Sequence, residues 1–74
     1  MNFIVNCVAR YAAIKAVKRD LQARGLKPHY LKSAAINAAA DAYLRMHPEL
    51  IVEAAERVRN DPTLRKLAER NLRL

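Results

Sequence analysis

Apolar residues recur three or four positions apart along most of the chain, which is the spacing of one face of an α-helix. In the first predicted helix, from about residue 2 or 6 to residue 24, the apolar stripe contains Phe3, Cys7, Ile14, Val17 and Leu21. Arg10 lies on the same stripe. Either its aliphatic stem extends past the edge of the apolar stripe and leaves the charge in solvent, or the residue lies at an interface with a partner. Residues 1–8 also suit a short strand, because Phe, Ile and Val favour strands.

Glycine and proline mark the breaks between the predicted helices. Gly25 followed by Leu26 predicts a helix C-cap, and Pro28 fits the first turn of a second helix that runs to about Met46. A third helix is expected from Pro48 to about residue 59 and a fourth from residue 62, with Asp61 as its N-cap. The pattern therefore predicts an all-α fold, with residues 1–74 forming a single domain and a small bundle of about four helices.

The second predicted helix is unusually rich in alanine, and its small side chains allow another helix to approach closely. Because its apolar face is wide, we expect this helix to be central, either contacting helices on two sides or lying across a dimer interface. The residues expected at an oligomer interface are Leu31, Ala35, Ala38, Ala42, Tyr43 and Met46.

A chain of 74 residues builds only a thin core and needs further stabilisation. Cys7 is the only cysteine, which excludes an intrachain disulfide, and we expect it to be a packed, unreactive thiol. His29 and His47 are too far apart in sequence for a structural zinc motif, and no metal or other cofactor is expected. Self-association, as a homo-oligomer and most simply a dimer, or a larger protein partner is the remaining source of stability.

The net charge of +7 is distributed unevenly along the chain. Residues 1–32 hold seven Lys or Arg against one Asp, which gives +6; residues 33–56 hold one against four carboxylates, which gives −3. Residues 57–74 hold six against two, which gives +4. Such a surface favours a polyanion, above all nucleic acid, because neutralising each phosphate releases condensed counterions.

We therefore expect cations from both ends of the chain to form one continuous strip that binds backbone phosphates. The start of the second helix is the strongest local feature, because helix N-termini attract phosphate. The candidate nucleic-acid-binding residues are Lys15, Lys18, Arg19, Arg24, Lys27, His29, Lys32, Arg65, Lys66, Arg70 and Arg73. Residues 9–46 can alternatively be interpreted as a helix-turn-helix, although Asp41 would then repel phosphate.

The sequence contains no arrangement typical of an enzyme. Ser33 and Thr63 are the only hydroxyl nucleophiles apart from tyrosine, and one glycine cannot form a phosphate-cradling loop. Neither a signal peptide nor a spanning segment is indicated, so the expected location is the cytoplasm.

These patterns predict a non-enzymatic accessory factor that binds nucleic acid, with a role in regulation or packaging. The first alternative is a protein-interaction module or small structural subunit that docks its alanine-rich helix on a larger partner. A more distant alternative is binding of anionic lipid through residues 2–24, and we do not expect a membrane as the main partner.

Overall fold

The computed structural model describes residues 3–72 and contains helices without any strand in that range. The α-helices are α1 (Phe3–Ala23), α2 (Ser33–Met46), α3 (Glu49–Asn60) and α4 (Pro62–Leu72), and the short 3-10 turn η1 (Pro28–Tyr30) precedes α2. The predicted all-α bundle of about four helices is confirmed. Phe3 already belongs to α1, so its helical start replaces the strand considered for this segment, while Met1 and Asn2 lie outside the described residues.

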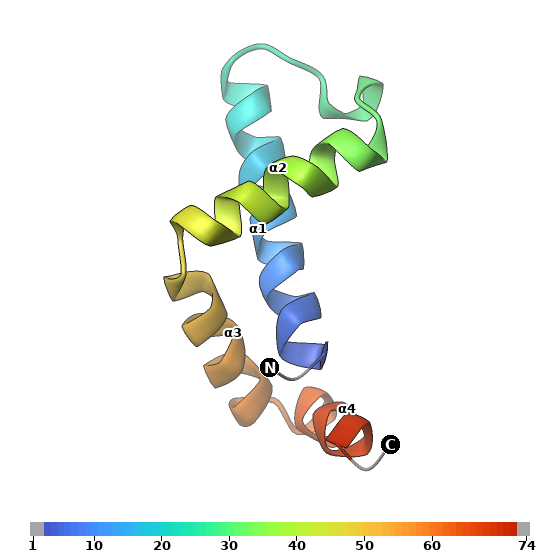
Figure 1. The fold of residues 1–74 in the computed structure, drawn as a ribbon, viewed down its shortest axis with the longest axis vertical. Coiled ribbons are helices and arrows are strands. Elements are labelled where there is room, and N and C mark those ends of the chain that lie inside the picture. Colours follow the sequence, from blue (N-terminus) through green and yellow to red (C-terminus); the bar gives the residue numbers. More distant parts are fainter. Residues whose placement is uncertain (1–2, 73–74) are drawn as a thin grey trace.

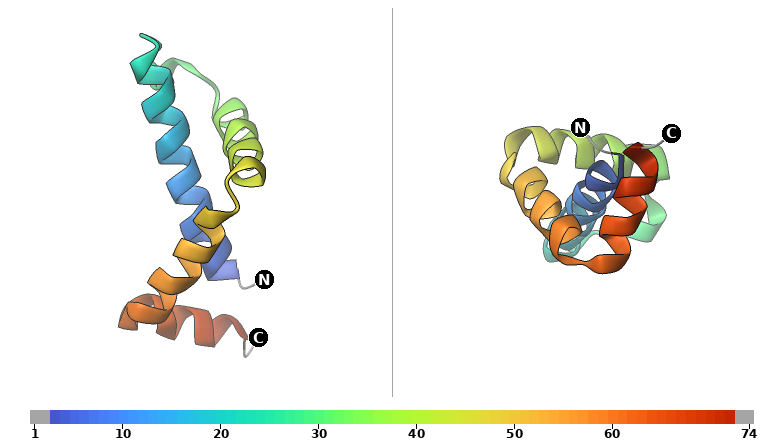
Figure 2. Two further views of the ribbon diagram at one scale, coloured as in Figure 1. Left: turned by 90° about the vertical axis from the view of Figure 1, so that its left-hand side faces the viewer. Right: turned by 90° about the horizontal axis from the view of Figure 1, so that it is seen from below.

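α1 is the central helix of the bundle, because it packs against α2, α3 and α4 (Figure 1). The expectation that the second helix is central within the subunit is wrong, because α2 packs mainly on α1. Its alternative position across a dimer interface stays a prediction. Length explains the central place of α1: the 21 residues of α1 span about 31 Å at 1.5 Å per residue, enough to run past all three shorter helices. α2 crosses one half of α1, and α3 with α4 packs along the other (Figure 2).

The core is thin and built from small side chains, as the length of the chain predicts. No large side chain is fully buried in the described residues. The buried apolar side chains of the three packed helices are Ala9, Ala13, Val17, Ile36, Ala40, Ala54 and Val58. Alanine at these positions lets the helices approach closely.

The buried face of α1 is only partly the stripe that its sequence suggests. Val17 of that stripe is buried, whereas Phe3 is 65% exposed and Cys7 is exposed, so both of these are wrongly predicted as core residues. Ala9 and Ala13, which lie outside the predicted stripe, complete the buried face. Close helix–helix approach at alanine, which periodicity of large apolar residues does not reveal, sets the orientation of α1.

Gly25 ends α1 as its sequence predicts. Its φ is +81°, a left-handed conformation that glycine adopts without steric cost. The amide of Leu26 donates to the carbonyl of Leu21 at 2.9 Å, and the amide of Gly25 donates to that of Gln22 at 3.0 Å. These two bonds form a Schellman motif, which satisfies carbonyls left free at the helix end.

α2 starts later than expected, because Pro28 begins the separate turn η1 rather than the helix itself. Within this turn the amide of Tyr30 donates to Lys27 and that of Leu31 to Pro28. Leu31 and Lys32 are then extended, with ψ of 146° and 143°, so helical geometry resumes only at Ser33. The buried ring of Pro28 fixes the turn against the rest of the protein.

The molecule is elongated, with extents of 42 × 21 × 20 Å and a radius of gyration of 13.8 Å. A compact chain of this length has a radius of gyration of about 11 Å. The connection from α1 to α2 lies at one end of the long axis and α4 at the other (Figure 1, Figure 2).

Candidate nucleic-acid interface

Seven of the predicted contact residues gather at one end of the molecule, which we call the basic end. It comprises the second half of α1 and the connection that leads through η1 to α2, at the top of Figure 1. All seven side chains are exposed: Lys15, Lys18, Arg19, Arg24, Lys27, His29 and Lys32. On α1, the residues at 15, 18 and 19 share the helix face opposite the buried Ala13 and Val17.

The cations of the basic end have no carboxylate partner within residues 3–72. Within residues 3–72, Arg10 forms an ion pair with Asp41, and His47 forms one with Glu49. None of these four residues belongs to the basic end. Asp20 is the only acidic residue between positions 3 and 32. The positive charge of the basic end is therefore available to an external anion.

A hollow of about 540 Å³ lies beside the basic end, between α1 and the segment from η1 into α2. Its apolar wall includes Ile14, Pro28 and Ile36. Its polar wall contains the cationic side chain of Lys18 and the ring of His29. The uncharged polar side chains of this wall are those of Gln22, Ser33 and Asn37. A small ligand that carries both a charged group and an apolar ring would meet suitable partners here.

Two exposed tyrosines accompany these cations. Tyr30 is 75% exposed at the end of η1, and Nζ of Lys27 lies 5.8 Å from the centroid of its ring. On α1, Nζ of Lys15 lies 5.6 Å from the ring centroid of the exposed Tyr11. Neither tyrosine is among the contact residues predicted from the sequence, although the position of Tyr30 between Lys27 and Lys32 is a signal for it.

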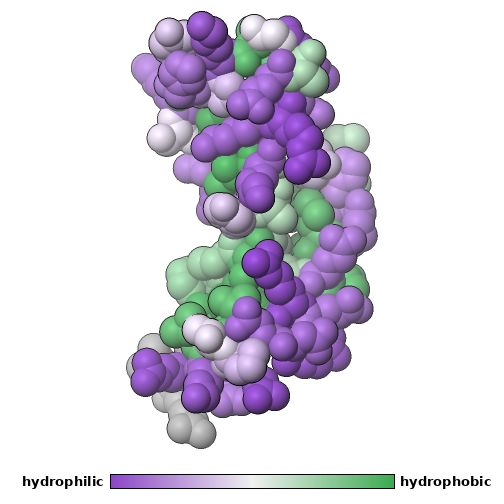
Figure 3. Space-filling model, turned by 180° about the vertical axis from the view of Figure 1, so that it is seen from behind, coloured by the Kyte–Doolittle hydropathy of each residue, from purple (hydrophilic) through white to green (hydrophobic). Residues whose placement is uncertain are grey.

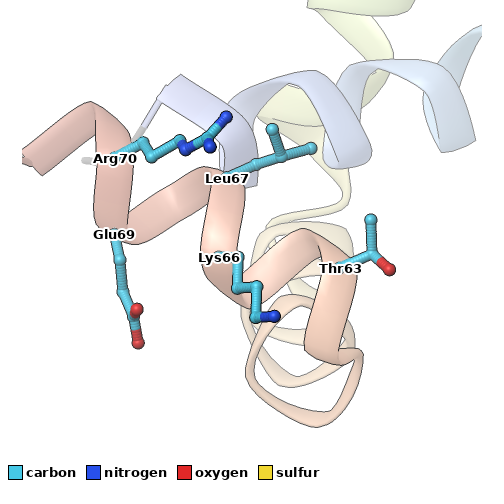
Figure 4. A pocket seen from close by; sticks show the side chains of 5 residues that line it. All are labelled: Thr63, Lys66, Leu67, Glu69 and Arg70. Carbon is cyan, nitrogen blue, oxygen red and sulfur yellow. The ribbon is translucent and has the colours of Figure 1, made fainter.

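The cations of α4 lie at the opposite end of the molecule. The side chains of Arg65, Lys66 and Arg70 are exposed, and Lys66 and Arg70 border a shallow depression together with Glu69. Figure 4 shows Arg70 reaching toward α1, whereas Lys66 and Glu69 point away from it. Arg73 lies outside the described residues.

The expected continuous strip of cations from both ends of the chain is not formed within one copy. α4 packs beside the N-terminal half of α1, where Leu64 and Leu67 border a groove with Ile4 and Val8. Its cations are therefore held away from the connection between α1 and α2 (Figure 1). The cations of α4 also lack an ion pair within residues 3–72, but the basic end holds seven of the predicted contact residues and α4 only three of the described ones.

The same groove contains the exposed thiol of Cys7, so the prediction of a packed thiol is wrong. Seen from behind, the molecule has apolar side chains gathered at and below the middle of its surface (Figure 3). The half that holds the basic end is mostly hydrophilic in the same view. Along α1 the outward surface thus changes from apolar, at Cys7 and Tyr11, to basic from Lys15 onward.

The alanine-rich stripe of α2 faces solvent. Ala35, Ala38 and Met46 are exposed, and Ala42 is half-buried. Leu31 is exposed as well, but its extended backbone precedes α2, so its predicted place on the stripe of this helix is wrong. A helix-turn-helix interpretation does not fit this outward face, because base edges are recognised by hydrogen-bonding side chains.

Tyr43 does not belong to the solvent-facing stripe of α2. Its side chain is half-buried, and its ring stacks on that of His47 with centroids 4.2 Å apart. Tyr43 is thus engaged within the chain, unlike the other residues predicted for an oligomer interface.

Glu49, at the start of α3, forms hydrogen bonds that alter its titration. The pKa of Glu49 is lowered, first by a hydrogen bond from its own backbone amide and then by one from the ring of His47. Nδ1 of His47 lies 3.0 Å from Oε1 of Glu49. A carboxylate in the first turn of α3 also interacts favourably with the positive end of the helix dipole.

The part of the chain that the structure describes contains no group of three potential metal-ligating side chains. Nor does any helix between residues 3 and 72 have the length and apolar character needed to cross a membrane. No protein-family model, curated protein or solved structure matches this chain.

Proposed function

We propose that this chain is a small basic helical protein that binds nucleic acid through backbone phosphates at its basic end, as an accessory factor in regulation or packaging. The observation that carries the proposal is the group of exposed cations around the connection from α1 to α2, none of which has a carboxylate partner within residues 3–72. Unpaired cations bind phosphates without first losing an internal ion pair.

The placement of acidic residues supports the same assignment. Asp41 is occupied by Arg10, and Glu49 by His47. Glu53 and Glu56 lie on α3, which packs along the half of α1 away from the basic end. Asp20 is the one acidic residue within the basic end, so anion repulsion there is small although the whole chain contains seven acidic residues.

The test is a titration of fluorescein-labelled 20-nucleotide strands, single and duplex, at two salt concentrations. If about four phosphates are neutralised, log K falls against log salt with a slope of roughly −3, because each contact on a single strand contributes about −0.7. Absence of binding to both probes at low salt would contradict the proposal.

Charge reversal locates the contact surface. Lys27→Glu combined with Lys32→Glu should weaken binding at least tenfold, and neither side chain caps a helix, so the fold is retained. The matched control is Arg59→Glu with Lys66→Glu, which removes the same charge from exposed positions on α3 and α4. Equal losses in both variants would show that total charge, rather than the basic end, governs binding.

We further propose that the protein acts as a homodimer through the exposed stripe of α2. The chain exposes 5805 Å² of surface. A compact monomer of this size exposes roughly 4,600 Å², which leaves an excess of about 1,200 Å². Specific interfaces bury about 600–1,000 Å² on each partner, so the excess is enough for one. Met46, which is 79% exposed, and the small side chains of Ala35 and Ala38 supply an apolar surface that permits close approach.

The same exposed stripe favours a second candidate function, docking of α2 on a larger protein partner. A homodimer is the simpler proposal, because it needs no additional component. The mass of the purified protein in solution distinguishes the homodimer from docking on a larger protein. A stable monomer would contradict the homodimer and favour a different protein partner.

A further inference from the structure

The exposed ring of Tyr30 has a defined position that the binding of phosphates alone does not explain. η1 is closed by two backbone hydrogen bonds, from Tyr30 to Lys27 and from Leu31 to Pro28. The buried ring of Pro28 anchors the turn. Tyr30 is thus presented to solvent by a fixed backbone, at 75% exposure.

The groups around this ring are those that a nucleotide needs. The centroids of the His29 and Tyr30 rings are 4.3 Å apart, and the ammonium group of Lys27 lies 5.8 Å from the Tyr30 centroid. A base stacked on an aromatic ring places its phosphates within reach of neighbouring cations. An aromatic surface, an ammonium group and an imidazole ring are therefore combined within the four consecutive residues 27–30.

His29 also borders the hollow between α1 and α2, which connects the turn to further polar groups. The side chains of Gln22, Ser33 and Asn37 line this hollow and make no hydrogen bond with the described residues. Amide and hydroxyl groups of this kind can bind the edge of an unpaired base. Lys18 lies in the same wall and can bind the adjoining phosphate.

From this arrangement we propose that the basic end binds single-stranded nucleic acid, with one base stacked on Tyr30 and a neighbouring nucleotide held in the hollow lined by Lys18, Gln22, His29, Ser33 and Asn37. The inference rests on the proposed function and narrows it to a class of substrate. A duplex cannot use this surface in the same way, because its bases are stacked on one another and paired at their edges. Tyr11, with Lys15 above its ring, offers a second stacking surface further along α1.

The experiment compares wild-type protein with Tyr30→Ala and Tyr30→Phe, using a labelled 12-nucleotide thymidine strand, the same length of uridine strand and a mixed-sequence duplex. Loss of base stacking on alanine corresponds to about a five- to hundredfold weakening for the single strands. Tyr30→Phe should bind like wild type, because the aromatic face remains. Affinity for the duplex should be lower than for the single strands and insensitive to either substitution. The thymidine and uridine arms show whether DNA or RNA is preferred.

A direct readout of stacking comes from Tyr30→Trp, because the natural chain contains no tryptophan. Its fluorescence should be quenched by the thymidine strand and not by the duplex. Val52→Trp, at an exposed position on α3 outside both proposed binding surfaces, is the matched control and should keep its fluorescence.

The outcomes separate this inference from the proposed function. Equal affinity for single and double strands, with no effect of Tyr30→Ala but a strong effect of the Lys27 and Lys32 reversals, would refute the stacking site and leave phosphate binding supported. Failure to bind any of the probes at low salt would refute both.

Discussion

Nη2 of Arg10 lies 3.2 Å from Oδ2 of Asp41 and connects the middle of α1 to α2. Arg10 interrupts the apolar spacing of its helix, and the structure accounts for it by an ion pair inside the subunit. The pair also occupies the carboxylate of α2 that would otherwise repel a phosphate backbone.

We expect this ion pair to contribute little to stability, because both side chains are 47% exposed and therefore well screened by solvent. Arg10→Ala should lower the free energy of unfolding by less than about 1 kcal/mol, and high salt should reduce the difference. Urea unfolding of both single variants and the double variant with Asp41→Ala gives the coupling energy. A coupling above about 2 kcal/mol would show that the pair is more strongly shielded than its exposure indicates.

Asp61 caps α4, and its loss should be more damaging than that of the exposed ion pair. Its Oδ1 accepts hydrogen bonds from the amides of Thr63 at 2.9 Å and Leu64 at 3.2 Å. Asp61→Ala should cost about 1 kcal/mol in the free energy of unfolding, whereas Asp61→Asn should retain most of the stability because asparagine also caps helices well. Urea unfolding followed by helical circular dichroism measures both variants; equal losses would indicate that the cap hydrogen bonds are not the cause.

The cap formed by Asp61 is an example of a feature that the sequence predicts correctly. Helix ends follow from local chemistry, so the sequence correctly predicts Gly25 at the end of α1 and Asp61 at the start of α4. Pro28 is the exception: proline suits the first turn of an α-helix and of a 3-10 turn equally, and only the extended backbone at Leu31 and Lys32 distinguishes them.

Packing could not be predicted as well from the sequence. Periodicity assigns the large residues Phe3 and Cys7 to the core, but small Ala9 and Ala13 are buried because helices approach closest there. Likewise, charge counts along the chain predicted one strip of cations, whereas the position of α4 depends on tertiary contacts. The hollow beside the basic end joins residues from α1, η1 and α2, and no local pattern reveals it.

The lowered pKa of Glu49 gives a prediction for stability against pH. Because the pKa of this carboxyl is lower in the folded protein than in the unfolded chain, its ionised form stabilises the fold above the unfolded pKa. This contribution is lost as the pH falls through the folded pKa. Glu49→Gln should therefore show a smaller loss of stability between pH 5 and roughly pH 3 than wild type. Glu53→Gln, on the same helix but without a hydrogen-bond partner, is the control in urea unfolding across this range.

The exposed stripe of α2 leads to a prediction for the oligomeric state. Ala38→Glu places a charge in the middle of the proposed interface and should convert a dimer to a monomer, with helical content retained because Ala38 is exposed. Val52→Glu, an apolar-to-acidic change at an exposed position of α3, should leave the dimer intact. Light scattering coupled to size-exclusion chromatography gives the mass, and a dimer that persists with Ala38→Glu would place the interface elsewhere.

The central claim is that the basic end, rather than the whole charged surface, contacts nucleic acid. The most direct measurement is a titration of the ¹⁵N-labelled protein with a short thymidine strand, followed by amide chemical shifts. We predict that the largest changes fall between residues 15 and 37, with smaller changes in α4. Changes of equal size in both regions, or changes concentrated in α4, would contradict the account.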